Sequence, residues 1–332
     1  MTQTVLVTYG DGSGPKVIRS AERVLRLVAP DLDIIHGRIG ADAYENTSYA
    51  LPPETMEMIS RADMILSGPV CMEGINERDP LVTIKKQMGL FLDYREYYPL
   101  KDVDGSTRLD TVVISPTLES TMDVYETESL DGVASEFYTD IESVERLMSR
   151  SSDIARMKHR PRIDLVTSNY IYPKRERLIQ NMFLEHFRGT AFRTGIMSLS
   201  ETVFTLAHRP EVPDVLLCDI HSAASVKGAA AGIVGGTGLM PQAFFGNGKS
   251  LFTPATMFGE DIPHRSENPT SAILSVALLL LSIGMEDGYR AVRNAVRMMY
   301  RDERTTPDIG GKLTPDKFTD GIIDLVKADI YM

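Results

Sequence analysis

The beginning of the chain is the feature that most constrains the fold. Residues 4–9 (TVLVTY) are mostly β-branched and apolar, and they run directly into the glycine-rich segment 10–15 (GDGSGP). From residue 17 to residue 28, apolar side chains recur at the spacing of one helix face. Pro15 suits the first turn of a helix, where a backbone N–H has no intrahelical partner. This segment therefore predicts a strand, a tight turn and a helix.

The same alternation of short strands and helices continues along the chain. Further strands are predicted at 33–39, 64–67, 110–114, 163–167 and 213–217, and helices at 52–62, 81–92, 141–158, 176–185, 223–234 and 271–283. Residues 118–140 are acidic and rich in Ser and Thr, and they predict an arm or hairpin. Strands separated by helices form mostly parallel sheets, so we expect an α/β fold. The 332 residues fit two domains or one large α/β unit.

Composition excludes several classes of protein. The 35 basic and 46 acidic residues give a net charge of −11, which argues against a general nucleic-acid binder. Two cysteines are too few for a disulfide framework, and they fit a reducing compartment. The apolar run at 272–283 is too short to cross a membrane, and the N-terminus lacks the features of a signal peptide. We therefore expect a cytoplasmic protein that binds neither nucleic acid nor membrane.

Eight segments, in this order and spacing, resemble the isocitrate/isopropylmalate dehydrogenase family of β-decarboxylating dehydrogenases. They are GDGSGP (10–15), LPPETMEMISRADMILSGPV (51–70), IKKQMGLFLDYRE (84–96), HRPEVPDVLL (208–217), AAAGIVGGTGLMP (229–241), FFGNGKSLFTP (244–254), ENPTSAILSVALLL (267–280) and TPDIGGKLTPDKFTDGII (306–323). The resemblance implies two α/β domains with a cleft between them. Residues 1–98 and 236–332 would form the large, nucleotide-binding domain. Residues 99–235 would form the small domain and the dimer interface, with an arm around 118–140.

The resemblance also implies where the family's metal ligands and acid–base residues should stand. Ala224 and Gly228 occupy the positions of two aspartates one helical turn apart, and Ser200 occupies that of a third, which comes from the partner subunit. The general-base lysine falls at Ile171 and the tyrosine acid at Met122. Because Mg²⁺ and Mn²⁺ prefer oxygen ligands, we expect that the family's metal site is not retained, and we assign no metal ligand.

Other residues then become candidates for catalysis. Tyr125 lies in the predicted arm, and Tyr170 lies beside the position of the missing base, so either hydroxyl could serve as an acid. Alternatively, these tyrosines are packing residues. Lys227, on the predicted helix 223–234, could replace the charge of the missing metal ion, or it could be a solvated lysine.

Asp219 and His221 form a further polar pair. They follow one predicted strand and precede a helix, where ligands collect in open α/β sheets. They could act as an acid–base pair or as two metal ligands. In the alternative interpretation, Ser222 caps the helix and His221 is a solvated neighbour.

The substrate site implied by the resemblance is altered. Lys85, Arg95 and Ser115 stand at the family's three arginine positions, so only Arg95 keeps the guanidinium that binds carboxylates bidentately. We expect a small anionic metabolite. Asp79 and Asp93 lie beside these residues in the sequence and make a tricarboxylate improbable.

The dinucleotide site is also altered. Gly12, Ser13, Gly68, Asp261 and Asn268 remain from the family's pattern and are our candidate contacts for NAD or NADP. The residues 256–259 (TMFG) stand where the family has a small-residue loop containing His-Gly-Ser-Ala, and their bulk would obstruct the usual pose. A dinucleotide bound at the glycine-rich turn in a pose shifted from the family's usual one stays possible.

Three functions therefore stay open. The first is an NAD(P)-dependent oxidoreductase that acts on a small anionic 2-hydroxy acid through a rebuilt site that does not use Mg²⁺. The second is a non-redox enzyme, such as a decarboxylase or lyase, on the same scaffold. The third is a non-catalytic or regulatory subunit that pairs with a paralogous chain. Ordinary turnover of isocitrate or isopropylmalate is not expected. A homodimer is the default assembly.

Overall fold

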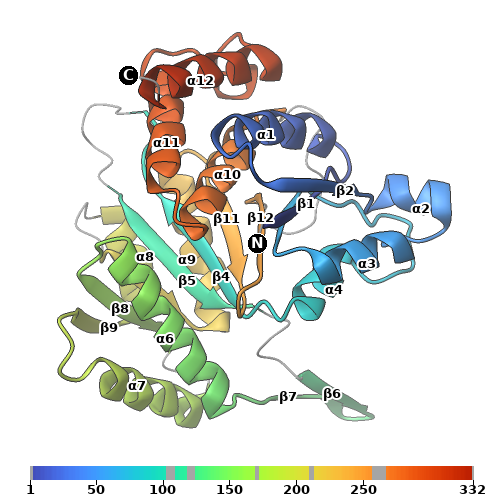
Figure 1. Cartoon of the computed structure of the whole chain (residues 1–332). Coiled ribbons are helices and arrows are strands. Elements are labelled where there is room, and N and C mark those ends of the chain that lie inside the picture. Colours follow the sequence, from blue (N-terminus) through green and yellow to red (C-terminus); the bar gives the residue numbers. More distant parts are fainter. Residues whose placement is uncertain are drawn as a thin grey trace.

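The computed structural model describes residues 3–101, 109–117, 124–168, 172–208, 213–255 and 267–330. Within these ranges, ten strands form one twisted sheet in the order β2-β1-β3-β12-β11-β4-β5-β10-β8-β9, with helices on both faces (Figure 1). The strands are β1 (Thr4–Thr8), β2 (Asp33–Gly37), β3 (Met64–Ser67), β4 (Leu92–Tyr97), β5 (Thr111–Pro116), β8 (Arg162–Thr167), β9 (Arg193–Ser198), β10 (Val215–Cys218), β11 (Pro241–Phe245) and β12 (Ser250–Pro254).

The direction of the strands changes in the middle of the sheet. Strands β2, β1, β3 and β12 are parallel to one another, and so are β5, β10, β8 and β9. Between these halves, β11 pairs antiparallel with β12 and with β4, and β4 pairs antiparallel with β5. The two parallel halves therefore run in opposite directions, so their carboxyl ends lie at opposite edges of the sheet.

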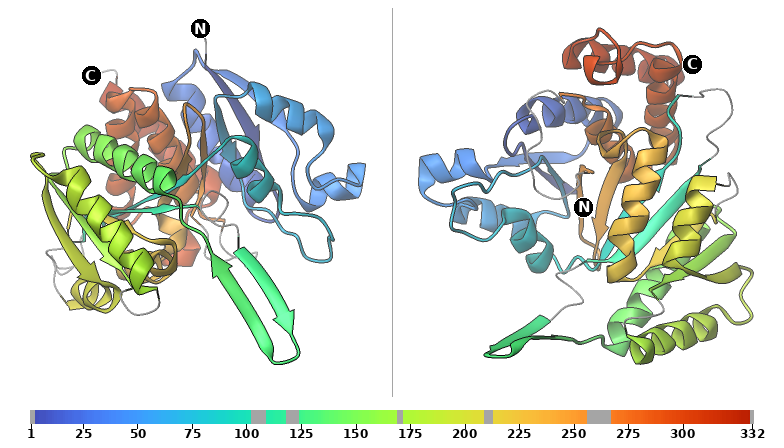
Figure 2. Two further views of the ribbon diagram at one scale, coloured as in Figure 1. Left: turned by 90° about the horizontal axis from the view of Figure 1, so that it is seen from below. Right: turned by 180° about the vertical axis from the view of Figure 1, so that it is seen from behind.

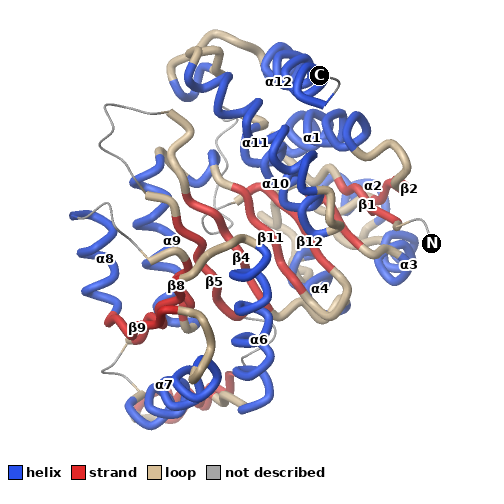
Figure 3. The backbone as a smooth tube through the Cα atoms, turned by 60° about the vertical axis from the view of Figure 1, so that its left-hand side comes forward, coloured by secondary structure: helices blue, strands red, loops and turns tan. Residues whose placement is uncertain are grey.

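Eleven described α-helices and two short 3₁₀ helices surround the sheet. They are α1 (Gly14–Val28), α2 (Ala41–Thr47), α3 (Pro53–Arg61), α4 (Pro80–Gln87), α6 (Ile141–Met157), α7 (Pro173–Phe187), α8 (Leu199–His208), α9 (Ile220–Val234), α10 (Thr270–Ser282), α11 (Glu286–Arg301), α12 (Pro315–Ile330), η1 (Thr237–Leu239) and η2 (Pro307–Ile309). Every residue of α10 from Thr270 to Leu281 is buried. This helix packs on β11 and β12 and against α1 and α11, which explains its almost continuous apolar sequence (Figure 3).

The hydrophobic core occupies both faces of the sheet because apolar residues follow each other without alternation in the buried strands. On one face, register partners Leu6, Ile65 and Leu251 pack with Ile59 of α3 and Ile84 of α4. On the other face, the neighbouring strand residues pack with α1 and α10. Burial on both faces is what the predicted α/β class requires.

A two-stranded hairpin projects from the body of the molecule (Figure 2). Its strands β6 (Val124–Ser129) and β7 (Gly132–Phe137) pair antiparallel and are joined by a two-residue turn. The side chains of Leu130 and Val133 are exposed. The hairpin confirms the arm or hairpin predicted between residues 118 and 140.

Most predicted elements are present, but one prediction is wrong in part. The helix expected at 81–92 ends at Gln87, and Gly89 follows with φ +60°, which is unfavourable for other residues. The chain then enters β4, which the periodicity did not predict. The strands β9, β11 and β12 were also not predicted. No helix among the described residues is long and apolar enough to span a membrane.

Candidate active site

Three of the predicted site residues meet on one face of the central strands. Arg95 lies on β4, Ser115 on β5 and Lys227 on α9, and Nζ of Lys227 donates a hydrogen bond to Oγ of Ser115 at 2.7 Å. Asp93 is the register partner of Ser115, and directly opposite residues of antiparallel strands point to the same face. Helix α9 covers this face and brings Lys227 onto it.

Asp93 is the centre of this group. Its Oδ2 lies 2.7 Å from Nζ of Lys227, and its Oδ1 accepts a hydrogen bond from Nε2 of Gln242 at 3.2 Å. The guanidinium of Arg95 is also close, with Nε 3.4 Å from Oδ1. Only 11% of the Asp93 side chain and 8% of the Lys227 side chain are exposed. We call these residues and Ser115 the Asp93 cluster; its two cations and one carboxylate leave one net positive charge.

The electrostatics of the cluster keep Asp93 ionised. Burial would raise the pKa of this carboxyl, but the charges of Lys227 and Arg95 outweigh burial and hold the pKa well below its usual range. A buried carboxylate without such partners would be strongly destabilising.

Lys85 lies near the cluster on the same face. Its Nζ is 5.0 Å from the ring centroid of Phe244, and Phe244 is the register partner of Asp93. Asp79, which the sequence placed beside the substrate residues, caps α4 instead, because its Oδ1 accepts from the Leu81 N–H at 2.7 Å. The structure thus gives Asp79 a local structural role.

Asp219 is the N-cap of α9. Its Oδ1 accepts from the Ser222 N–H at 2.8 Å, and its Oδ2 lies 2.9 Å from Nη1 of Arg175. Nε of Arg175 in turn donates to Oγ1 of Thr139 at 2.8 Å. The sequence-based alternative placed the cap at Ser222, but the aspartate three residues earlier performs this role.

His221 lies next to this cap, against Tyr172, with the ring centroids 5.3 Å apart. Burial lowers the pKa of His221, and the charge of Asp219 opposes this only in part. Lys227 lies eight positions after Asp219, which is roughly 12 Å along a helix axis. Among the catalytic candidates that the structure describes, Lys227 is therefore in one group, and Asp219 and His221 are in another.

Close backbone contacts around the turn after β1 require glycine at two positions. A Cβ atom on Gly14 would lie 2.2 Å from the carbonyl oxygen of Tyr9, and a Cβ on Gly68 would lie 2.0 Å from the same oxygen. Gly12 has φ +59° and open space around it, and Ser13 is the N-cap residue of α1. The backbone of Gly12 is accessible, so this position could approach a dinucleotide. Gly14 and Gly68 are required by the close packing of the backbone, whether or not a dinucleotide binds.

Asn268 is engaged within the protein. Its Nδ2 donates to Oδ2 of Asp308 at 3.0 Å and to the hydroxyl of Tyr300 at 3.3 Å, and its Oδ1 accepts from the Thr270 N–H at 3.0 Å. These bonds hold the start of α10 against η2. A nucleotide contact of Asn268 stays a prediction.

Some predicted residues are not placed. Tyr170 and Asp261, together with the side chain of Tyr125, lie outside the described residues.

Gln242 and Arg175 were missed by the sequence reasoning. The alternation in PQAFF (241–245) could have indicated that Gln242 shares a face with Phe244, whereas nothing distinguishes Arg175 within KRER (174–177).

The residues of α9 do not fit the metal site that the resemblance implies. Ala224 is exposed, Gly228 is partly exposed, and neither carries an oxygen ligand. We therefore derive no step through a metal ion.

Comparison with known proteins establishes the class. The family model for isocitrate/isopropylmalate dehydrogenase matches residues 4–326, and the chain belongs to this family. Members are β-decarboxylating, NAD(P)-dependent dehydrogenases that use a divalent metal, bind small acids and form homodimers.

Individual relatives are distant but match over nearly their full length. The chain is 27% identical to homoisocitrate dehydrogenase of Methanocaldococcus jannaschii over 349 residues, covering 98% of both chains. It is 28% identical to 3-isopropylmalate dehydrogenase of Sulfurisphaera tokodaii, covering 94% of this chain and 96% of the relative. The crystal structure of isocitrate dehydrogenase from Methylococcus capsulatus has a TM-score of 0.87 at 21% identity, covering 98% of this chain and all of that one. These matches confirm the predicted fold and family.

Proposed function

We propose that this protein is an NAD(P)-dependent oxidoreductase that acts on a small anionic 2-hydroxy acid through a rebuilt site. Membership of the family supports the redox chemistry. The Asp93 cluster carries the substrate proposal, because it places Arg95 and Lys227 on one face with one net positive charge. Such a cluster favours an acid with few carboxylates over a tricarboxylate.

In this proposal the residues have distinct roles. Arg95 and Lys85 bind the substrate carboxylate, and Ser115 positions Lys227, because its hydroxyl accepts a hydrogen bond from Nζ of Lys227. Lys227 supplies positive charge beside the reacting hydroxyl, in place of the family's metal ion, so activity does not require Mg²⁺. Bound NAD(P)⁺ would accept the hydride, and Gly12, a residue of the open turn, would lie against it.

The remaining site predictions belong to the same proposal. Ser13, Gly68, Asp261 and Asn268 would complete the nucleotide site. Tyr125, Tyr170, Asp219 and His221 stay candidates for proton transfer.

The domain and subunit organisation is also proposed. Residues 1–98 and 236–332 would form the large domain, and 99–235 the small domain with its arm. The projecting hairpin supports the assignment of the arm to the interface of a homodimer, because its exposed apolar side chains would be buried there. The named relatives are enzymes, which favours a catalytic protein over a non-catalytic subunit.

The first test is the shift in melting temperature with NAD⁺, NADP⁺ or neither, each with and without Mg²⁺. A ligand that binds only the native state raises stability by mass action. We expect a shift with one nucleotide that is independent of Mg²⁺. No shift with either nucleotide would contradict the redox proposal and favour a non-redox enzyme, such as a decarboxylase or lyase. A shift that requires Mg²⁺ would contradict the metal-independent site.

The second test uses a matched pair of lysines on α4. Lys85→Ala should weaken binding of a small hydroxy acid, measured by calorimetry with nucleotide present. Lys86→Ala should not, because Lys86 is the exposed neighbour on the same helix. Equal affinities for the two variants would remove Lys85 from the site.

A further inference from the structure

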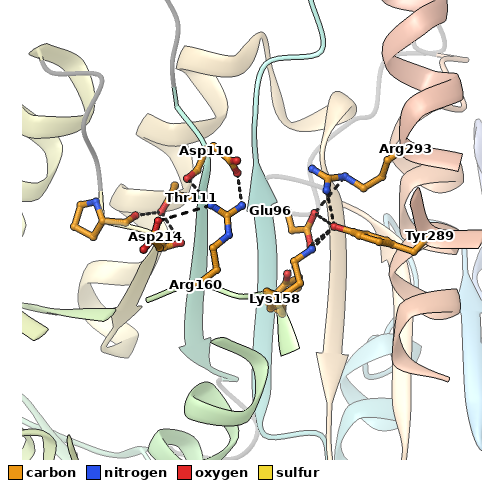
Figure 4. A network of polar contacts seen from close by, with 10 residues as sticks. Glu96, Asp110, Thr111, Lys158, Arg160, Asp214, Tyr289 and Arg293 are labelled. Carbon is orange, nitrogen blue, oxygen red and sulfur yellow. Dashed lines mark hydrogen bonds and ion pairs between the residues drawn. The ribbon is translucent and has the colours of Figure 1, made fainter. Parts of the chain in front are cut away.

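The opposite face of β4 carries a second group of buried charges. Side chains alternate along a strand, so Tyr94 and Glu96 point away from the face of Asp93 and Arg95. Glu96 is only 3% exposed, although a carboxylate is among the groups least often buried. Figure 4 shows Lys158, Tyr289 and Arg293 converging on it.

The contacts around Glu96 are close and mutually connected. Its Oε1 lies 2.6 Å from Nζ of Lys158 and accepts from the Tyr94 hydroxyl at 2.6 Å. The Tyr289 hydroxyl lies 3.2 Å from Oε2 and also contacts Nζ of Lys158. Nη1 of Arg293 donates to that hydroxyl at 2.7 Å, and its Nε lies 3.9 Å from Oε2. We call Glu96, Lys158, Tyr289 and Arg293 the Glu96 cluster.

The members of the Glu96 cluster come from three separate elements. Glu96 belongs to β4, Lys158 ends α6, and Tyr289 and Arg293 lie one turn apart on α11. Helix α6 falls in the proposed small domain and α11 in the proposed large domain. The cluster therefore joins the two proposed domains at the strand that carries Arg95 and Asp93.

We infer that Glu96 is a positioning residue that sets the angle between α6 and α11 and, through β4, the place of Arg95 and Asp93. Any rotation of α6 against α11 would withdraw Lys158 or Tyr289 and leave a buried carboxylate without its partners, which is costly. The geometry thus favours a single arrangement of the two helices. The role in positioning Arg95 rests on the proposed function, whereas the coupling of the helices does not.

The test measures a distance between the two proposed domains. Spin labels on the native Cys71, which is exposed, and on an introduced Leu184→Cys, also at an exposed position, report the separation by pulsed electron resonance. Glu96→Gln removes the charge at the same size. Tyr289→Phe removes one hydroxyl from the Glu96 cluster. If Glu96→Gln fails to fold, the label distance in Tyr289→Phe tests the inference. Glu303→Gln, in the exposed pair with Lys101, is the matched control.

We expect Glu96→Gln and Tyr289→Phe to shift or broaden the distance distribution, and Glu303→Gln to leave it unchanged. If Glu96 only stabilises the fold, Glu96→Gln will lower the melting temperature without changing the distance between the labels. Unchanged distributions in folded Glu96→Gln and Tyr289→Phe would overturn the inference. Because no substrate or nucleotide is added, this result is independent of the nucleotide test of the proposed function.

Discussion

Lys227 and Asp93 form a buried ion pair, with Nζ 2.7 Å from Oδ2, although 134 positions separate them in the chain. Strand β4 presents Asp93 to the face that α9 covers, and α9 presents Lys227 to the same face. Position 227 is one residue before Gly228, where the resemblance implies an aspartate in the family. On our proposal, Lys227 supplies a positive charge close to the position that this implied carboxylate would occupy.

This ion pair leads to the first prediction. Lys227→Met keeps most of the side-chain volume but leaves Asp93 as a buried charge without its nearest partner. We expect the free energy of unfolding to fall by about 3–5 kcal/mol, measured by urea denaturation. Lys86→Ala, on the exposed side of α4, should stay within about 0.5 kcal/mol of the wild type. A Lys227→Met variant as stable as this control would show that the pair is not a stabilising contact.

The second prediction concerns pH. Burial would raise the pKa of Glu96, but the charges of Lys158 and Arg293 outweigh it and lower the pKa from 4.5 to about 2. A carboxyl whose pKa is lowered by folding stabilises the protein fully above its unfolded pKa. This contribution, about 3 kcal/mol, is lost as the pH falls from about 4.5 to 2.

Glu96→Gln should therefore show a smaller loss of stability between pH 5 and pH 3 than the wild type. Urea unfolding at several pH values measures this slope. Glu57→Gln, at an exposed position of α3, should keep the wild-type slope. If all three proteins lose stability in parallel, Glu96 does not have a lowered pKa.

The third prediction distinguishes the two cysteines. Cys218 is buried at the end of β10, and burial raises the pKa of its thiol to about 12. Because the thiolate is the reactive form, Cys218 should be inert at pH 8 while the exposed Cys71 reacts. A thiol assay on the native protein should count one group, and Cys71→Ser should abolish the signal. Reaction of a second thiol before unfolding would contradict this.

The fourth prediction compares two glycines. Gly68→Ala would place a Cβ 2.0 Å from the carbonyl oxygen of Tyr9, so the backbone of the turn must shift. We expect a loss of roughly 1–3 kcal/mol in the free energy of unfolding. Gly232→Ala, on α9 with open space around it, should instead stabilise by about 0.5–1 kcal/mol, because alanine favours helices. A stable Gly68→Ala protein would show that the turn adapts freely.

Local patterns predicted much of the fold. The strand, turn and helix at residues 4–28 follow from the apolar spacing and the glycines, and the structure confirms them as β1 and α1. The periodicity did not predict β4, because residues 92–97 contact two different groups of partners on alternate sides of the strand. Asp93 and Arg95 face one cluster, whereas Tyr94 and Glu96 face another, so β4 lacks the apolar and polar alternation of a half-exposed strand.

Local periodicity and motifs in a recognisable order are sufficient to predict the α/β class, the family, the glycine turn and three members of the Asp93 cluster. Which charges meet depends instead on how the strands and helices pack. Asp93 with Lys227, Glu96 with Lys158 and Arg175 with Asp219 are pairs between elements far apart in the chain. Their contact depends on the strand order and on which face each helix covers. The spacing of residues along the chain indicates neither the strand order nor the face that each helix covers.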